Sequence, residues 1–188
     1  MPRMRAFRGF VPNSDQVDPG KVICPPYDVI PDEMHHQLLD HAPENAVRGI
    51  LGDQPGVTPN EEVFRKCGES MRSAVEVGTI LPEEKPAMYR YSIRYGNRDG
   101  GTSLLQGVIA VAEARPWGEG VERHEEIRSH VVERLIAQAR LTTIDTGVVQ
   151  LSCEGLEEVL AGVNAGPEAG ELVFESTDFQ GDLSLIHI

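Results

Sequence analysis

Two consecutive prolines, Pro25 and Pro26, constrain this chain more than any other local feature. They follow the short apolar run 21–24 and are followed directly by Tyr27 and Asp28. Because a proline has no backbone N–H, a strand over 21–24 cannot continue its hydrogen-bonded ladder past this point. The sequence therefore predicts a short strand that ends in a rigid elbow, from which Tyr27 and Asp28 project as polar side chains.

The charge of the chain limits its partners. The 188 residues include 17 Lys and Arg against 30 Asp and Glu, which gives a formal net charge of −13. Such an acidic surface repels phosphate backbones and anionic lipids. Aromatic residues make up only 5% of the chain, so few side chains are available for stacking on bases. We therefore do not expect this chain to bind nucleic acid.

The cysteines and the apolar runs indicate the compartment. Cys24, Cys67 and Cys153 are odd in number and contain no CxxC pair, so neither a zinc site nor a disulfide framework is indicated. No apolar run approaches the ~20 residues that span a bilayer, and the N-terminus has no signal-peptide core. The sequence predicts a cytoplasmic protein with reduced thiols and no membrane association.

Helix signals are clearest in the first half of the chain. Asp32 and Glu33 suit the first turn of a helix over 32–41. The run 58–61 combines an N-cap Thr58 with a proline and a glutamate, and it predicts a helix that ends at Gly78. Further helices are expected at 125–140 and 154–163.

Strands are expected at 4–10, 21–24, 46–51, 86–95, 102–112, 148–152 and 171–176. Residues 96–101 are rich in glycine and predict a hairpin between two of these strands. The strand at 102–112 is apolar on both faces, which favours a central position. Helices that interleave with an antiparallel hairpin predict an α+β fold, with a mixed, largely antiparallel sheet and helices packed against it.

The last six residues, 183–188, differ from the rest of the chain. They form an abrupt apolar run without an expected partner element, similar to the translated read-through of a sequencing adapter. We expect this tail to be non-native. The remaining residues, 1–182, are expected to form a single α+β domain that is the N-terminal part of a longer protein.

His124 and Glu125 precede the predicted third helix and follow a glycine-rich loop. The free N–H groups of a helix N-terminus favour anions. A histidine there could act as a general base, and a glutamate could orient it or bind Mg²⁺. The alternative is that the acidic residues only complement the helix dipole and that His124 is exposed.

The elbow and the arginines offer further candidates. Asp28 is either a base or metal ligand, or it caps the following helix. Arg90 and Arg94 share one strand face at roughly 13 Å, so they either bracket a phosphate-bearing ligand or form a solvated face. Arg8 and Arg134 are further anion-binding candidates. Arg134 can equally pair with a glutamate nearby, Glu133 or Glu126.

Several other kinds of site are not indicated. The histidines at 35, 36 and 41 do not share a helix face well, and HExxH is absent. No GxSxG elbow supports a serine nucleophile, and no GxxxxGK[ST] loop supports a P-loop. Cys24 lies in an apolar run that suggests packing.

Three stretches of the chain are informative together: Ala6–Phe10, Val22–Ile30, and His124–Glu125 followed by Glu133–Leu135. They resemble the motifs of one family, domain of unknown function 1015. The resemblance covers about residues 4–180. The chain has Cys24 where the family usually has alanine, and its segment 127–134 lacks the usual Gly-Pro-Lys loop. It also contains no ParB-type Gly-Glu-Arg-Arg box.

Members of this family are often labelled as ParB-like, and that superfamily includes nucleotide-binding proteins and free-serine kinases. The resemblance thus implies a phosphate or nucleotide ligand, with Mg²⁺ and a nucleotide as cofactors and kinase-like phosphoryl transfer to a small molecule. One alternative is a ParB-like binding or regulatory module without catalysis, and another is a structural or assembly domain. The expected catalytic residues are His124, Glu125 and Asp28, and the expected ligand-binding residues are Arg8, Pro26, Tyr27, Arg94 and Arg134.

Overall fold

The structure is a computed structural model, and it describes residues 2–123, 126, 128–152, 155, 157–158 and 160–161, together with the backbone of 172–177 and 183–187. Its helices are α1 (Pro19–Val22), η1 (Tyr27–Val29, a 3-10 turn), α2 (Asp32–His41), α3 (Val47–Ile50), α4 (Glu61–Glu76) and α5 (Ser129–Thr142). Its strands are β1 (Met4–Arg5), β2 (Phe10–Pro12), β3 (Ile80–Pro82), β4 (Tyr89–Gly96), β5 (Thr102–Ile109), β6 (Val111–Ala112), β7 (Leu172–Thr177) and β8 (Leu183–His187).

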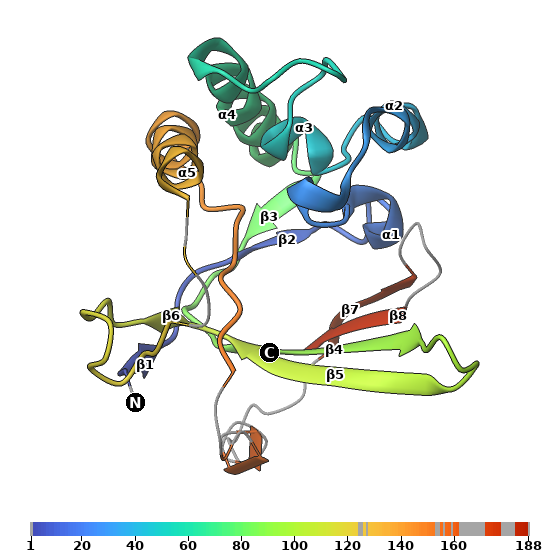
Figure 1. Cartoon of the computed structure of the whole chain (residues 1–188). Coiled ribbons are helices and arrows are strands. Elements are labelled where there is room, and N and C mark those ends of the chain that lie inside the picture. Colours follow the sequence, from blue (N-terminus) through green and yellow to red (C-terminus); the bar gives the residue numbers. More distant parts are fainter. Residues whose placement is uncertain are drawn as a thin grey trace.

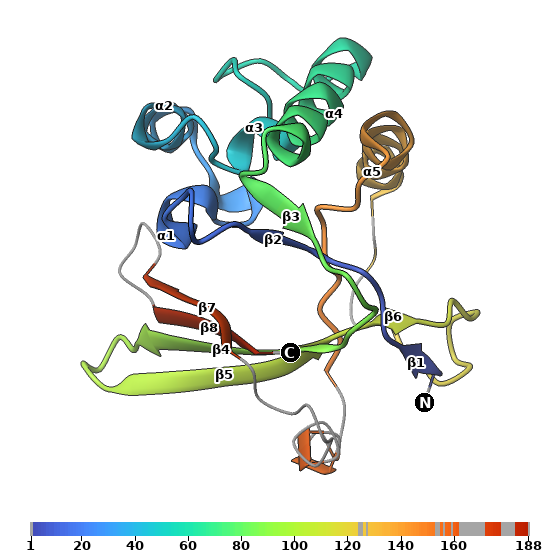
Figure 2. The same ribbon diagram turned by 180° about the vertical axis from the view of Figure 1, so that it is seen from behind.

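Helices α1 to α5 lie together on one side of the molecule, and a four-stranded sheet lies on the other (Figures 1 and 2). The order of this antiparallel sheet is β5-β4-β8-β7. The short ribbon β2–β3 runs between the two layers, and β1 pairs with β6 near the N-terminus. This architecture confirms the predicted α+β class. In the described part of the chain, no helix is long and apolar enough to cross a membrane.

Helix α4 forms the centre of the helical layer. Its Phe64 and Cys67 are almost completely buried, and Leu38 of α2 and Val47 of α3 are buried in the same layer. On the α5 side, a Cβ on Gly68 would lie 3.0 Å from Thr142 Cα and 3.1 Å from the Leu141 carbonyl oxygen. Burial of these apolar side chains supplies the main stabilisation of the layer, at roughly 25 cal/mol per Å².

The two predicted helices in the first half are present. Helix α2 has the predicted bounds, and Gly78 ends α4 with a φ of 82°. The predicted cap at Thr58 is wrong, because the N-cap is Asn60. The Asn60 Oδ1 accepts hydrogen bonds from the N–H groups of Glu62 at 3.0 Å and Val63 at 3.1 Å. Asparagine is among the best N-cap residues, so the helix begins two residues later than expected.

Two predicted strands are single helical turns instead. The first half of the run 21–24, Lys21 and Val22, ends α1, whose N-cap Asp18 accepts a hydrogen bond from the Gly20 N–H, and the backbone is extended at Ile23. The run 46–51 forms α3, where the Asn45 Oδ1 accepts from the Val47 N–H. In both places a side-chain oxygen satisfies a free N–H at the start of the turn, and this local bond favours helix over strand.

Three other strand predictions change. The predicted strand 4–10 is divided into β1 and β2, with a single bridge from Phe7 to Ala87 between them. The predicted strand 102–112 is divided into β5 and β6, and β5 is at the edge of its sheet rather than at the centre. Residues 148–152 form no strand, and Val148 and Val149 are more than 70% exposed.

The predicted hairpin between β4 and β5 is confirmed. The Asn97 N–H donates to the Gly101 carbonyl at 2.8 Å, and the Gly100 N–H donates to the Asn97 carbonyl at 3.0 Å. Gly100 has a φ of 83°, in the left-handed region. These features define a three-residue loop, residues 98–100, that closes at a left-handed glycine, and the length of this loop fixes the pairing of the two strands.

The C-terminal tail, for which the sequence indicated no partner element, is paired in the structure. Leu183–His187 forms β8, which lies between β4 and β7. An apolar segment can join any open sheet edge through backbone hydrogen bonds, so this pairing does not bear on whether the tail is native. The non-native tail and the single domain over 1–182 stay predictions. The predicted helix 154–163 lies largely outside the described residues, whereas the predicted last strand is present as β7.

Candidate functional site

The diproline elbow is held in place by a buried asparagine. The Nδ2 group of Asn45 donates to the carbonyl oxygens of Lys21 at 2.7 Å and Ile23 at 3.0 Å, and the Ala46 N–H donates to the Val22 carbonyl at 2.6 Å. Asn45 is only 2% exposed. These bonds fix the end of α1 against α3, so the chain enters the two prolines in one direction.

Past the prolines, the chain turns immediately into η1. The Val29 N–H donates to the Pro26 carbonyl at 3.1 Å. Tyr27 is half-buried, whereas Pro26 and Asp28 are exposed. The alternative role of Asp28 as a helix cap is wrong, because the N-cap of α2 is Pro31 and no side chain caps that helix. The Asp28 carboxylate is therefore available to solvent or to a ligand.

Two predicted ligand-binding residues from distant parts of the sequence meet at this elbow. The guanidinium carbon of Arg134, on α5, lies 4.2 Å from the centre of the Tyr27 ring. A cation over an aromatic face at this distance is stabilised by about 0.5–2 kcal/mol. The alternative local partner Glu126 instead pairs with Arg123 at 3.3 Å. In the described part of the chain, no carboxylate forms an ion pair with Arg134.

The predicted catalytic pair, His124 and Glu125, lies outside the described residues. Their neighbours are described: the Arg123 guanidinium lies 5.5 Å from the Trp117 ring centre. Helix α5 begins at Ser129 and not at the predicted residue 125. Arg128 at the N-cap position makes no side-chain capping bond, and the lack of a short polar cap explains why the start was misplaced.

Arg8 and Arg94 are exposed and lie toward opposite ends of β4. Arg8 Nε donates to the Glu83 carbonyl at 2.8 Å, next to Gly9, whose N–H donates to the Tyr89 hydroxyl at 2.9 Å. Tyr89 begins β4, and Arg94 follows about 17 Å further along the strand. The structure thus shows no convergence of these two arginines, and their roles in ligand binding stay predictions.

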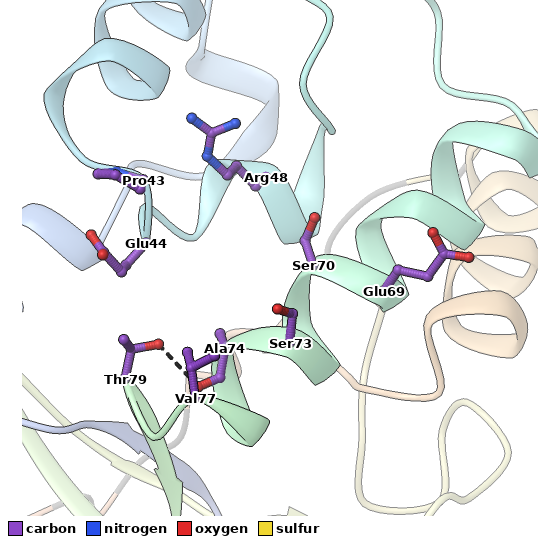
Figure 3. A pocket seen from close by; sticks show the side chains of 9 residues that line it. All are labelled: Pro43, Glu44, Arg48, Glu69, Ser70, Ser73, Ala74, Val77 and Thr79. Atoms are coloured by element: carbon purple, nitrogen blue, oxygen red, sulfur yellow. Dashed lines mark hydrogen bonds between the residues drawn. The ribbon is translucent and has the colours of Figure 1, made fainter.

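A separate hollow of about 440 Å³ opens between α4 and the segment that links α2 to α3 (Figure 3). Glu44 and Arg48 line it on one side and Ser70 and Ser73 of α4 on the other, and none of the predicted site residues lines it. Arg48 is held by the Asp53 carboxylate and the Leu39 carbonyl, while its Nε is buried without a partner. We place the candidate site at the elbow, because predicted residues meet there.

Burial determines the pKa, and with it the reactivity, of the Cys24 thiol next to the elbow. Desolvation raises the pKa of Cys24 to about 11, so the group is a neutral thiol at physiological pH and a poor nucleophile. This agrees with the packing role that the sequence suggested. Within the described residues, no group of three or more His, Cys, Asp or Glu side chains is placed to hold a metal ion.

Sequence reasoning missed Asn45 and Arg48. Asn45 precedes a segment that was predicted as a strand, where it would read as an ordinary turn residue. Its partners at 21–23 are separated from it in sequence by a helix and a loop. A side chain that bonds across such a distance leaves no local pattern. Arg48 bonds closer by, to Asp53 and to the Leu39 carbonyl, and it was missed because its segment was predicted as a strand.

A family model described as Protein of unknown function (DUF1015) matches residues 4–187. The match covers nearly the whole chain, and the chain belongs to this family. This confirms the resemblance that the three sequence stretches indicated. No curated protein and no solved structure matches the chain.

Proposed function

We propose that this DUF1015 protein binds a small phosphate-bearing ligand at the diproline elbow, with Arg134 as the residue that anchors the phosphate. The observation that carries the proposal is the position of the Arg134 guanidinium over the Tyr27 ring, with its central carbon 4.2 Å from the ring centre. It joins α5 to the elbow, and both residues were expected to bind ligand on sequence grounds.

A position over an aromatic ring suits an arginine that binds an oxyanion. A guanidinium has five N–H donors, all of which lie in its plane. When its face rests on an aromatic ring, the donors at its edge stay available for a bidentate contact with phosphate. Arg134 is half-buried, so a charge-assisted hydrogen bond there is screened less than at a fully exposed position.

The remaining predicted residues would complete the site as follows. Asp28 follows Tyr27 directly and would serve as a base or as a carboxylate for Mg²⁺. His124 and Glu125 precede α5, the helix that carries Arg134, and Glu125 is the alternative base. In this form the reaction is a kinase-like phosphoryl transfer to a small molecule. Arg8 and Arg94 lie toward opposite ends of β4, so no more than one of them would neutralise charge on the same phosphate.

A thermal-shift screen tests the proposal, with ATP, GTP and inorganic phosphate as probes, each with and without Mg²⁺. A ligand at one hundred times its Kd stabilises the folded protein by about 2.7 kcal/mol, which such a screen detects. We expect a shift for at least one probe, at least tenfold weaker binding for Arg134→Lys, and no detectable binding for Arg134→Ala. Lysine keeps the charge but loses the planar fork.

Matched variants distinguish a specific contact of Arg134 with the ligand from a general effect of positive charge on binding. Arg140→Ala removes an exposed arginine from the same helix and should leave binding unchanged. Tyr27→Phe keeps the aromatic face and should bind like the wild type, whereas Tyr27→Leu should bind more weakly. If no probe shifts the melting temperature, the proposal fails. Salt-dependent binding to duplex DNA would instead favour the ParB-like module.

A further inference from the structure

The most deeply buried side chains of helix α5 are polar. Its two buried residues, Gln138 and Thr142, both carry hydrogen-bonding groups, whereas the apolar side chain of Ile136 is 45% exposed. The Thr142 hydroxyl bonds within its own helix end, to the carbonyl oxygens of Gln138 and Ile144, both at 2.9 Å. The amide of Gln138 therefore remains as the buried polar group of α5 that can reach another element.

Gln138 connects α5 to α3. Its Nε2 group donates to the Ile50 carbonyl oxygen at 3.2 Å, between residues that are 88 positions apart in the sequence. Ile50 is the last residue of α3, so its carbonyl has no partner within that helix. Among the described residues, this is the only hydrogen bond that joins α5 to another element.

This bond closes a ring of contacts around the candidate site. Helix α3 follows Asn45, which bonds to the segment before the prolines, and it ends at Ile50, which bonds to Gln138. Arg134 precedes Gln138 by four residues, so the two lie on the same side of α5, about 6 Å apart along its axis. The contact of Arg134 with Tyr27 completes the ring. Helix α5 is thus joined to the elbow twice, directly at Tyr27 and indirectly through α3.

The packing of α5 beside α4 defines its position less sharply (Figure 1). At Gly68, α4 presents backbone without a side chain, which limits the approach of the two helices but does not interlock with α5. A displacement of α5 by one residue corresponds to about 1.5 Å along its axis or about 100° around it. A cation–π contact requires the cation over the ring face, within about 6 Å of its centre. A directional hydrogen bond restricts both movements.

We propose that Gln138 is the residue that positions Arg134 for the ligand at the elbow. Its bond to the Ile50 carbonyl sets the height and the rotation of α5, and this holds the guanidinium over the Tyr27 ring. Gln138 is only 7% exposed, so it acts through the helix and not by contact with the ligand. The effect on ligand binding rests on the proposed phosphate site, whereas the effect on the contact between Arg134 and Tyr27 does not.

Nuclear magnetic resonance of the full chain with isotope-labelled arginine tests the positioning without any ligand. The ring current of Tyr27 displaces the signals of protons over its face, so the side-chain signals of Arg134 should lie upfield in the wild type. Arg134→Lys identifies these signals by removing them, and Tyr27→Leu should remove their displacement. Gln138→Met keeps the length of the side chain but has no donor, and most of the displacement should be lost.

Two further variants separate positioning from general stability. Gln138→Asn keeps a buried amide whose arm is one methylene shorter, so it cannot bond to the Ile50 carbonyl unless α5 moves, and the Arg134 signals should shift. Thr142→Val is the matched control, because it removes the other buried polar group of α5, whose bonds stay at its own helix end. It should lower the melting temperature and leave the Arg134 signals in place. If both Gln138 variants keep the full displacement, the proposal is wrong and Gln138 serves stability alone.

Ligand binding supplies the second measurement. With a probe that shifts the wild-type melting temperature, such as ATP or inorganic phosphate, Gln138→Met should bind at least about tenfold more weakly, because a misplaced arginine no longer meets the phosphate. Thr142→Val should bind like the wild type. Equal affinity of the wild type and Gln138→Met would overturn the proposal. If no probe binds to the wild type, the proposed phosphate site fails, and the arginine signals still decide whether Gln138 positions Arg134.

Discussion

At the scale of single residues, the geometry of the elbow depends most on Asn45. One buried amide satisfies two carbonyl oxygens of the segment before the prolines, and its own oxygen accepts from the Val47 N–H. A buried polar group left without its partner costs about 1–3 kcal/mol, so this arrangement tolerates little change. Asn45, which has no catalytic role in the proposed site, therefore fixes the position from which Tyr27 and Asp28 project.

Another residue-scale feature gives a pH dependence. Burial, with a smaller contribution from the Asp53 charge, raises the pKa of Cys67 from 9.0 to about 11. The unfolded chain loses this thiol proton near pH 9, and the folded chain keeps it until about pH 11. The stability that this difference contributes is complete below pH 9 and is lost as the pH rises toward 11. It amounts to at most about 2.7 kcal/mol.

Urea unfolding at about pH 8 and about pH 10.5 measures this dependence. We expect the wild type to lose more free energy of unfolding between the two values than Cys67→Ala loses. Alanine also leaves a small cavity, which lowers stability at both pH values alike, so the comparison rests on the difference between them. Equal losses in the two proteins would show that the Cys67 thiolate is not the cause.

Sequence reasoning identified Tyr27 and Arg134 separately, but it did not pair them. Tyr27 was found because it follows the diproline, and Arg134 because it lies in the segment that resembles the family. Their contact depends on how α5 packs against the rest of the helical layer, and a local pattern contains no information about that packing.

At the scale of elements, the length of each predicted helix or strand decided whether its prediction succeeded. The helices over 32–41 and 61–76 are long enough to show a 3.6-residue period, and both are present. The runs 21–24 and 46–51 are too short for the period to separate one helical turn from a short strand. Their outcome depended on the side chains of Asp18 and Asn45, which accept hydrogen bonds from the N–H groups of Gly20 and Val47 in the first turn of α1 and α3.

The packing of α4 against α5 gives an element-scale prediction. A Cβ at Gly68 would lie 3.0 Å from Thr142 Cα and 3.1 Å from the Leu141 carbonyl, and these backbone atoms cannot move without shifting α5. We expect Gly68→Val to lower the free energy of unfolding by about 1–3 kcal/mol, as overpacked cores do. Chemical denaturation followed by circular dichroism measures it.

Glu69→Val provides the control for this substitution. It places the same side chain on the exposed face of α4 one residue later, so it shares the lower helix propensity of valine without the steric conflict. The expected cost is below about 1 kcal/mol. If Gly68→Val and Glu69→Val have similar stability, the close approach of α4 and α5 does not limit the packing.

At the scale of the whole molecule, the class of fold followed from the sequence, but the order of the strands did not. The interleaved helices and the glycine-rich hairpin were sufficient to predict α+β. The position of β5 at the edge of the sheet could not be predicted in the same way. Residues such as Leu104 and Leu105 make this strand apolar on both faces, and that pattern is the same for a central strand and for an open edge strand. Strand order is set by pairings between distant segments, and alternation within a strand does not encode them.

The net charge of −13 gives a prediction for the molecule as a whole. Like charges in the compact state repel each other, and salt screens them with a Debye length of about 10 Å at 0.1 M. We expect the melting temperature near neutral pH to rise when NaCl increases from about 0.01 M to about 0.2 M, by about 2–4 °C for each kcal/mol gained. Scanning calorimetry measures it.

The same series of NaCl concentrations, measured near the isoelectric point, supplies the control. At pH close to 4.8 the net charge approaches zero, and the rise with NaCl should largely disappear. A rise of equal size at both pH values would point to general salting-out of apolar surface, and not to repulsion between acidic side chains.

The pairing of the first strands has a consequence for the order in which the chain folds. Met4 pairs with Ala112 and Phe10 with Pro82, whereas Asn45 reaches back only to Lys21 and Ile23. Short loops close at a lower entropic cost than long ones, so the elbow can form while the chain is still being synthesised. The N-terminal strands, although they leave the ribosome first, have to wait for partners made much later, and until then their open edges depend on Arg3, Arg5 and Arg8 to stay soluble.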